Sequence, residues 1–134
     1  MDRLLSIENA AYEYPWSRAQ FSSSLADTNT QSQALLLEDR IIGYVLFLPV
    51  AENADILNIC IDCKYQHQGF GQQLFARLLS KLQSLAVENL FLEVRASNAQ
   101  ALKFYHHLGF EAINTRKKYY SNLEDAKIMR LSIK

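Results

Sequence analysis

The sequence predicts a mixed α/β fold in which helices cover one β-sheet. Apolar runs such as IIGYVLFLPV (41–50) are typical of strands, whereas the leucines of residues 74–85 recur at helical spacing. A strand at 56–61 and a strand at 90–94 are joined through that helix, so we expect them to be parallel. With 134 residues, 49% of them hydrophobic, the chain is expected to form one domain over residues 1–134.

The first part of the chain predicts two short helices. Residues 3–14 place apolar side chains at roughly helical spacing, and Pro15 ends this pattern. Ser17, followed three residues later by Gln20, forms a capping box, which predicts the start of the second helix.

The middle of the chain predicts three strands, a helix and a fourth strand. A hairpin starts at Gln33, with its turn at Glu38-Asp39-Arg40, and a third strand covers residues 56–61. After a glycine-containing loop, the amphipathic helix extends to Leu85. Residues 90–94 then form an apolar strand that we expect to be buried.

The last part of the chain predicts one more helix and two more strands. Ser97 and Gln100 have the spacing of a second capping box, and Gly109 ends the helix that it opens. Strands follow near residues 111–118 and 126–132. The predicted order of elements is therefore α-α-β-β-β-α-β-α-β-β.

Composition and charge exclude several classes of protein. Fourteen basic and fourteen acidic side chains give no net charge, so no overall field attracts nucleic acid or an anionic membrane. No apolar run has the length of a signal peptide or of a membrane span. The two cysteines fit a reducing compartment. We expect a cytoplasmic protein with neither nucleic acid nor membrane as a direct partner.

Two of the four glycines, Gly69 and Gly71, lie one residue apart at the start of the amphipathic helix. The N-terminus of a helix binds anions, and bare backbone lets a phosphate approach it; a tight strand-to-helix turn would explain the same glycines. Gln72 and Gln73 stand where a Walker-type loop needs lysine and serine or threonine. Leu74 stands where a dinucleotide fold needs a third glycine or alanine, so neither loop type is expected.

Several separated motifs together carry a family resemblance. The pattern Gln66-x-x-Gly69-x-Gly71, followed by LEVRASNAQALKFYHHLGF at 92–110, resembles the GNAT superfamily of N-acetyltransferases. The second stretch, together with Pro15-Trp16-Ser17 and the run RKKYY at 116–120, is similar to the RimI branch, the bacterial ribosomal-protein-alanine N-acetyltransferases. The resemblance covers nearly the whole chain.

The resemblance implies acetyl-CoA as the donor. Its pyrophosphate would bind the backbone of the glycine loop, and its pantetheine arm would lie along the end of the third strand like an added strand. Asn98 matches a position whose side chain contacts the cofactor, although it could also cap a helix beside Ser97. The residues implied in cofactor binding are Ile59, Cys60, Ile61, Gln66, His67, Gln68, Gly69, Phe70, Gly71, Gln72 and Asn98.

Glu93 is the candidate general base. It interrupts an apolar strand, where a carboxylate is costly unless it is paired or used. The residues alone leave two interpretations open. Glu93 could act as a base, or it could form an ion pair with Arg95, which lies on the same face of the strand. The resemblance favours the base.

Tyr105 is the candidate general acid. It lies on the apolar stripe of its helix with Ala101, Leu102 and Leu108, a position that by itself favours core packing. The resemblance assigns it to protonation of the leaving thiolate.

Two further motifs are ambiguous. Cys60 and Cys63, with His67 four residues later, have the spacing of part of a zinc site, but the chain has no second cysteine pair and we expect no metal. The run at 116–120 mixes basic and aromatic residues, as nucleic-acid binders and solvated strand ends both do. The resemblance suggests instead an acceptor groove, with Trp16, Tyr119 and Tyr120 as the substrate-binding residues.

The chain departs from the family pattern at two places. Cys63 occupies a loop position where related enzymes often have proline. RimI-type enzymes usually begin with a strand before the first helix, whereas here the helix begins almost at Met1. We therefore expect the usual first strand to be missing, through a misassigned start, compensation by a partner or a tolerated loss.

The resemblance implies an Nα-acetyltransferase that modifies the N-terminal alanine of a small-subunit ribosomal protein by direct transfer in a ternary complex. Three alternatives stay open. The same chemistry could act on a small-molecule amine or on a protein lysine. The domain could sense acetyl-CoA without turnover, or it could bind nucleic acid through residues 116–120.

Overall fold

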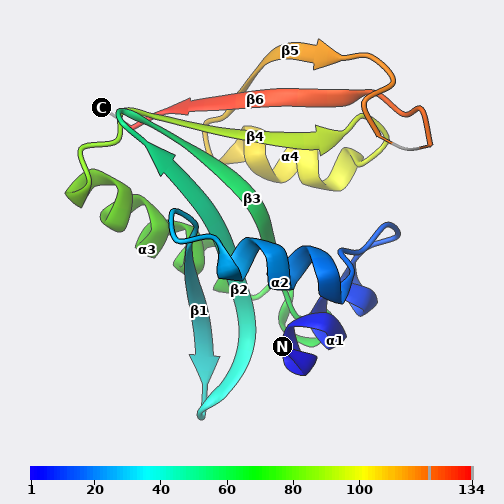
Figure 1. Cartoon of the computed structure of the whole chain (residues 1–134), viewed down its shortest axis with the longest axis vertical. Helices are drawn as coiled ribbons and strands as arrows, with labels where there is room; N and C mark the ends of the chain where they lie inside the picture. The colour runs from blue at the N-terminus through cyan, green and yellow to red at the C-terminus, as the bar shows by residue number, and fades with distance from the viewer. Residues whose placement is uncertain (121, 134) are drawn as a thin grey trace.

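The computed structural model describes residues 1–120 and 122–133, which form one six-stranded sheet with helices on both faces (Figure 1). The helices are α1 (Asp2–Ala11), α2 (Arg18–Ala26), the 3-10 turn η1 (Cys63–Tyr65), α3 (Phe70–Ser84) and α4 (Ala99–His107). The strands are β1 (Gln31–Leu37), β2 (Arg40–Val50), β3 (Asn53–Ile61), β4 (Asn89–Arg95), β5 (Glu111–Arg116) and β6 (Ala126–Ser132). The predicted order of elements is confirmed.

The strand order in the sheet is β1-β2-β3-β4-β6-β5. All neighbouring strands are antiparallel except β3 and β4, whose predicted parallel pairing is confirmed. The first element is α1, and β1 lies at one edge of the sheet. No helix in the described part of the chain is long and apolar enough to cross a bilayer.

One of the two predicted capping boxes forms. Ser17 caps α2, and both hydrogen bonds of its box with Gln20 are present. The box predicted for Ser97 and Gln100 was wrong, because the N-cap of α4 is Asn98, whose side chain accepts the N–H of Ala101 at 3.1 Å. An asparagine one residue further on meets the same chemical need as a serine, so the spacing alone could not decide between them.

The parallel strands β3 and β4 separate soon after they meet (Figure 1). They pair only from Asn53 to Asp55 on one side and from Asn89 to Phe91 on the other. Beyond these residues β3 continues to Ile61 and β4 to Arg95 without pairing to each other. The unpaired halves enclose a wedge that opens towards the carboxyl ends of both strands.

A β-bulge in β3 accompanies this separation. Leu46 of β2 pairs with Asn58 and Phe47 pairs with Ile56, so Leu57 is an extra residue in β3. Because side chains alternate along a strand, one extra residue reverses which face the following side chains occupy. Leu57 packs towards α1 and α2, and Asn58 also faces α1, where it hydrogen-bonds Glu8.

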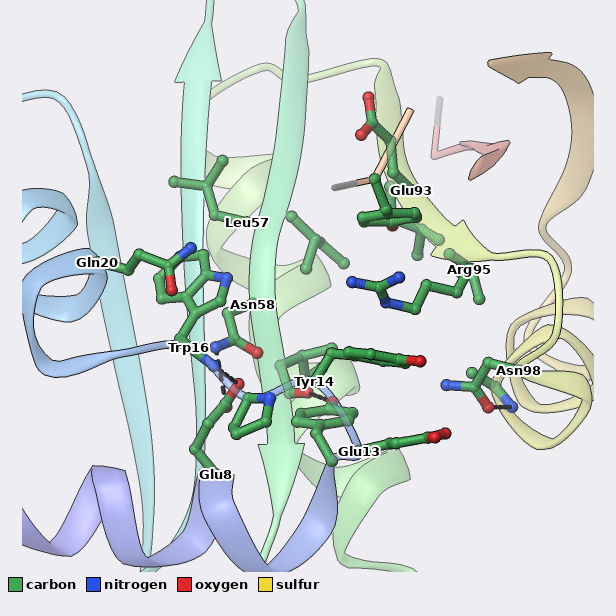
Figure 2. A pocket seen from close by; sticks show the side chains of 18 of the residues that line it. Glu8, Glu13, Tyr14, Trp16, Gln20, Leu57, Asn58, Glu93, Arg95 and Asn98 are labelled. Carbon is green, nitrogen blue, oxygen red and sulfur yellow. Dashed lines mark hydrogen bonds between the residues drawn. The ribbon is translucent and has the colours of Figure 1, made fainter. Parts of the chain in front are cut away.

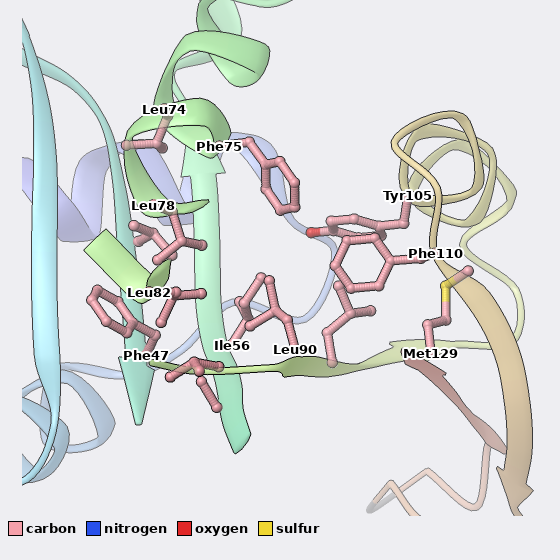
Figure 3. Packing of buried hydrophobic residues seen from close by; sticks show 14 of the residues in the cluster. Phe47, Ile56, Leu74, Phe75, Leu78, Leu82, Leu90, Tyr105, Phe110 and Met129 are labelled. Carbon is pink, nitrogen blue, oxygen red and sulfur yellow. The ribbon is translucent and has the colours of Figure 1, made fainter. Parts of the chain in front are cut away.

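The main core lies between the sheet and the helices α3 and α4 (Figure 3). Leu78 and Leu82 of α3 and Leu90 of β4 are fully buried there. The rings of Phe75 and Phe110 lie 5.7 Å apart in the same cluster, which joins α3 to the end of α4. A smaller core on the other face of the sheet packs α1 and α2 around Ile7, Phe21, Tyr44, Leu46 and Cys60.

Candidate active site

The wedge between β3 and β4 holds a cavity of about 600 Å³ (Figure 2). It is lined by β3 and β4, by the C-terminal end of α1, by the loop between α1 and α2, and by α4. Glu93 and Tyr105, the two predicted catalytic residues, both line it. The lining side chains with polar groups are Glu8, Tyr12, Glu13, Tyr14, Trp16, Gln20, Asn58, Glu93, Arg95, Asn98, Tyr105 and Tyr120.

Glu93 stands on β4 with a side chain that is 31% exposed. Its carboxylate lies 3.6 Å from Nη1 of Arg116, and its hydrogen bond with Tyr119 raises the pKa of that tyrosine. The alternative interpretation of Glu93 as the partner of Arg95 was wrong, because Arg95 pairs with Glu124 at 3.2 Å. The Glu93 carboxylate therefore contacts Arg116 and Tyr119, and the same side chain also lines the cavity.

Tyr105 of α4 is 8% exposed and packs edge-on against Phe110, with ring centroids 5.6 Å apart. Burial raises the pKa of Tyr105 above its ordinary value of 10. The core-packing interpretation of this residue is therefore confirmed. Since the same side chain lines the cavity, its packing leaves room for a chemical role as well.

Tyr12 is a second tyrosine at the wedge that sequence reasoning did not single out. Its hydroxyl donates a hydrogen bond to the carbonyl oxygen of Ile59 on the unpaired half of β3. Burial raises its pKa well above the ordinary value, and the nearby Tyr105 adds to this effect. Both tyrosines are consequently protonated at neutral pH.

The loop from β3 to α3 has the features of an anion site. Gly69 is the N-cap of α3 with φ of +87°, a conformation that favours glycine, and a Cβ built there meets nothing within 4 Å. No side chain caps α3, so its first N–H groups face the loop. The side-chain amides of Gln66 and Gln68 donate within the loop, to the carbonyls of Ile61 at 3.0 Å and Lys64 at 3.1 Å. These features fit a diphosphate.

Gly71 differs from Gly69. It lies inside the first turn of α3, and an added Cβ would be 3.4 Å from the ring of Phe104, an ordinary contact distance. Backbone conformation therefore favours glycine at position 69 but not at position 71.

Glu8 of α1 is a site residue that sequence reasoning missed. It is 2% exposed, and its Oε1 accepts hydrogen bonds from the Tyr44 hydroxyl at 2.5 Å and the Asn58 amide at 2.9 Å. Its Oε2 accepts the backbone N–H of Trp16 at 2.9 Å (Figure 2). A signal was available, because Glu8 falls on the apolar stripe of α1 at helical spacing from Leu4.

The other predicted site residues fall into three groups. Four of them line the cavity, namely Trp16, Ile59, Asn98 and Tyr120. Tyr119 does not line it but forms a hydrogen bond with Glu93, which does. Cys60, Ile61 and the loop residues Gln66, His67, Gln68, Gly69, Phe70, Gly71 and Gln72 lie where β3 ends and α3 begins, outside the cavity lining.

The two cysteines lie in different surroundings. Cys60 is buried in the smaller core, where burial raises its pKa to about 12, while Cys63 is exposed. Among residues 1–120 and 122–133, no group of three histidine, cysteine or acidic side chains could hold a metal.

Comparison with known proteins identifies the family and the fold of this chain. The sequence profile of the acetyltransferase (GNAT) family matches residues 1–110, so the chain belongs to this family of acetyl-CoA-dependent N-acetyltransferases. Within the family, it is 37% identical over 130 residues to the [ribosomal protein bS18]-alanine N-acetyltransferase of Escherichia coli K12, covering 95% of this chain and 87% of that protein.

Solved structures agree with this assignment. The crystal structure of the ribosomal-protein-S18-alanine N-acetyltransferase from Escherichia coli superposes with a TM-score of 0.88 at 35% identity, covering 98% of this chain and 86% of that chain. A GNAT family acetyltransferase from Elizabethkingia anophelis, solved with acetyl-CoA bound, has a TM-score of 0.80 at 21% identity, covering 95% and 88%. The second likeness shows the fold alone.

We predict that Glu8→Gln will lower the free energy of unfolding by about 2–3 kcal/mol, since a glutamine offers one oxygen where three donors converge and hydrogen bonds to a charged group each contribute about 1.5–3 kcal/mol. Urea denaturation measures the change. Glu38→Gln, at an exposed turn, is the control and should stay within about 0.5 kcal/mol. Equal effects of the two changes would refute the role of Glu8.

Proposed function

We propose that this N-acetyltransferase modifies the N-terminal alanine of a small-subunit ribosomal protein of the bS18 type, in the cytoplasm. The observation that carries the proposal is the 37% identity to the Escherichia coli bS18-alanine N-acetyltransferase over 95% of the chain. Transfer is direct, within a ternary complex of enzyme, acetyl-CoA and acceptor. We also propose that residues 1–134 act as one domain, because β5 and β6, which follow the matched residues 1–110, complete the same sheet.

The donor would bind where β3 ends and α3 begins. The uncapped N-terminus of α3 and the backbone around Gly69 would hold the pyrophosphate, as both the dipole and the free N–H groups favour an anion. The edge of β3 from Ile59 to Ile61 does not pair with β4, so its backbone N–H groups would face the pantetheine arm. The carbonyls of Ile59 and Ile61 already accept hydrogen bonds from side chains. When bound, acetyl-CoA supplies the thioester that the acceptor amine attacks.

Glu93 would accept the proton that the acceptor amine loses. At pH 7, deprotonation costs about 1 kcal/mol for an α-amine with a pKa near 8 and about 5 kcal/mol for a lysine with a pKa near 10.4. A partly exposed carboxylate held by Arg116 suits the deprotonation of an α-amine, which has the smaller cost. A water would relay the proton where the carboxylate lies too far from the amine. The site chemistry thus fits an α-amine better than a lysine.

Tyr105 would complete the reaction. As the amine nitrogen bonds to the carbonyl carbon and the carbon–sulfur bond breaks, the thiolate takes the phenolic proton. The raised pKa of Tyr105 ensures that this proton is present at neutral pH. Trp16, Tyr119 and Tyr120 would border the acceptor, since two of them line the cavity and the third contacts Glu93.

The proposal is tested with a synthetic peptide that carries an N-terminal alanine, taken from a bS18-type protein, and an internal lysine. After incubation with the enzyme and acetyl-CoA, fragment mass spectrometry should place the acetyl group on the alanine nitrogen. Acetylation of the lysine alone would indicate a different acceptor class. Tight binding of acetyl-CoA without any transfer to peptide or to small amines would indicate a sensing module.

Glu93→Gln should reduce kcat by about 10²-fold or more, because the amide cannot accept the proton. Acetyl-CoA binding, measured by calorimetry, should be unchanged. Glu111→Gln, which changes an exposed glutamate of β5, is the matched control and should retain full turnover. Near-normal turnover of the Glu93 variant would exclude its role as the base.

Tyr105→Phe should keep the packing and reduce kcat by about 10²-fold. Because the pKa of Tyr105 is raised, its acid form persists to higher pH than that of an ordinary tyrosine. The rate should therefore rise with deprotonation of the acceptor amine and stay level up to about pH 10. A pH–rate profile of the native enzyme that falls below pH 10, with that fall absent in the variant, would contradict the raised pKa.

A further inference from the structure

Arg95, at the end of β4, is held between two aromatic rings from distant parts of the chain. Its guanidinium carbon lies 3.9 Å from the ring centroid of Tyr14 and 3.9 Å from that of Tyr120. Its Nη1 donates to Asn122 at 3.0 Å and to Glu124 at 3.2 Å. We call Arg95, Tyr14, Tyr120, Asn122 and Glu124 the Arg95 clasp.

The clasp joins three segments around the wedge. Tyr14 belongs to the loop between α1 and α2, Arg95 ends β4, and the other three residues belong to the loop between β5 and β6. The two loops also touch directly, because the Asn122 amide donates to the Tyr14 hydroxyl at 3.3 Å. Glu124 additionally accepts the backbone N–H of Ser97 at 3.0 Å, which fixes the clasp to the start of α4.

Arginine is the side chain that this arrangement requires. A planar guanidinium can stack on one ring with each face while its edge donates hydrogen bonds, whereas the ammonium of a lysine is a single point of charge. The side chains of Arg95 and Glu124 are 20% and 17% exposed, so their ion pair is partly shielded from water. The hydrogen bond from Ser97 and the ion pair with Arg95 lower the pKa of Glu124, which is charged at neutral pH.

The clasp borders the space that an acceptor must enter. Tyr14, Arg95 and Tyr120 line the same cavity as Glu93 and Tyr105. Figure 2 shows the Arg95 side chain extending from β4 across the wedge towards β3, with Glu93 and Tyr14 on opposite sides of it. The position of the two loops therefore depends on Arg95 at the point where the acceptor would bind.

We propose that Arg95 is a positioning residue that locks the α1–α2 loop to the β5–β6 loop and thereby forms the acceptor side of the site. This inference deepens the proposed function, since it concerns the binding of the peptide and not that of acetyl-CoA. Arg95 itself takes no proton. Its contribution is to hold Tyr14 and Tyr120 in place before the peptide arrives, which saves the free energy of ordering two loops on binding.

The first test needs no substrate. Hydrogen exchange is measured for the native enzyme, Arg95→Met and the control Arg130→Met, which removes an exposed arginine of β6 outside the clasp. We expect faster exchange in Arg95→Met at both residues 12–16 and residues 122–125, although these segments are far apart in the sequence. Exchange that is unchanged at either segment overturns the proposal.

The second test is kinetic. Arg95→Met should raise the KM for the alanine peptide at least tenfold, with kcat within about threefold and the dissociation constant of acetyl-CoA within about twofold. Arg95→Lys, which keeps the charge without the plane, should show the same pattern. Full rescue by lysine, or a loss confined to kcat, would overturn the positioning role.

The two proposals fail in distinguishable ways. If the native enzyme does not acetylate the peptide, the proposed function is wrong, while the exchange experiment still decides whether the clasp exists. Tyr14→Leu removes one face of the stack and should loosen the same two segments. Combined with Arg95→Met it should add little, because both changes break one interaction. Fully additive effects would contradict the clasp.

Discussion

The separation of β3 from β4 is the constraint on which the rest of the site depends. Two neighbouring parallel strands that stop pairing leave backbone donors and acceptors inside a folded domain, and such groups need other partners. Side chains satisfy two of them, since Tyr12 donates to the carbonyl of Ile59 and Gln66 to that of Ile61. The remaining edge of β3 faces the cavity. An extended ligand with amide groups is the natural occupant of such an edge, which is why a donor with a pantetheine arm suits this fold.

Two glutamates at the wedge have different surroundings, and the roles that we propose for them differ accordingly. Glu8 is 2% exposed and accepts three hydrogen bonds, so its carboxylate is fully occupied in joining α1, β2, β3 and the α1–α2 loop. The Glu93 side chain is 31% exposed and has its cationic partner 3.6 Å away, which leaves its oxygens accessible to water and to an acceptor. A saturated buried carboxylate stabilises structure, whereas a partly solvated one can exchange protons.

The two sides of the wedge are built by different means. On the proposed donor side, local backbone geometry at Gly69 and the uncapped N-terminus of α3 would provide the site, with few side chains taking part. On the proposed acceptor side, the backbone is loop, and side-chain contacts such as the stack of Arg95 between Tyr14 and Tyr120 hold it in place. Proteins that share one fold often differ in the substrates they act on. A backbone site for the donor and a side-chain site for the acceptor would fit such variation.

The sequence by itself determined the order of elements, the capping box of Ser17 and Gln20, the parallel pairing of β3 with β4 and the family. All of these features depend on hydrophobic periodicity and on motifs that span only a few residues, and both can be read directly from the sequence. Only the tertiary structure decided that Arg116 and not Arg95 pairs with Glu93, and that Glu8 bonds to Asn58, 50 residues away. Such contacts arise when the sheet brings distant segments together, and no local pattern encodes which side chains then meet.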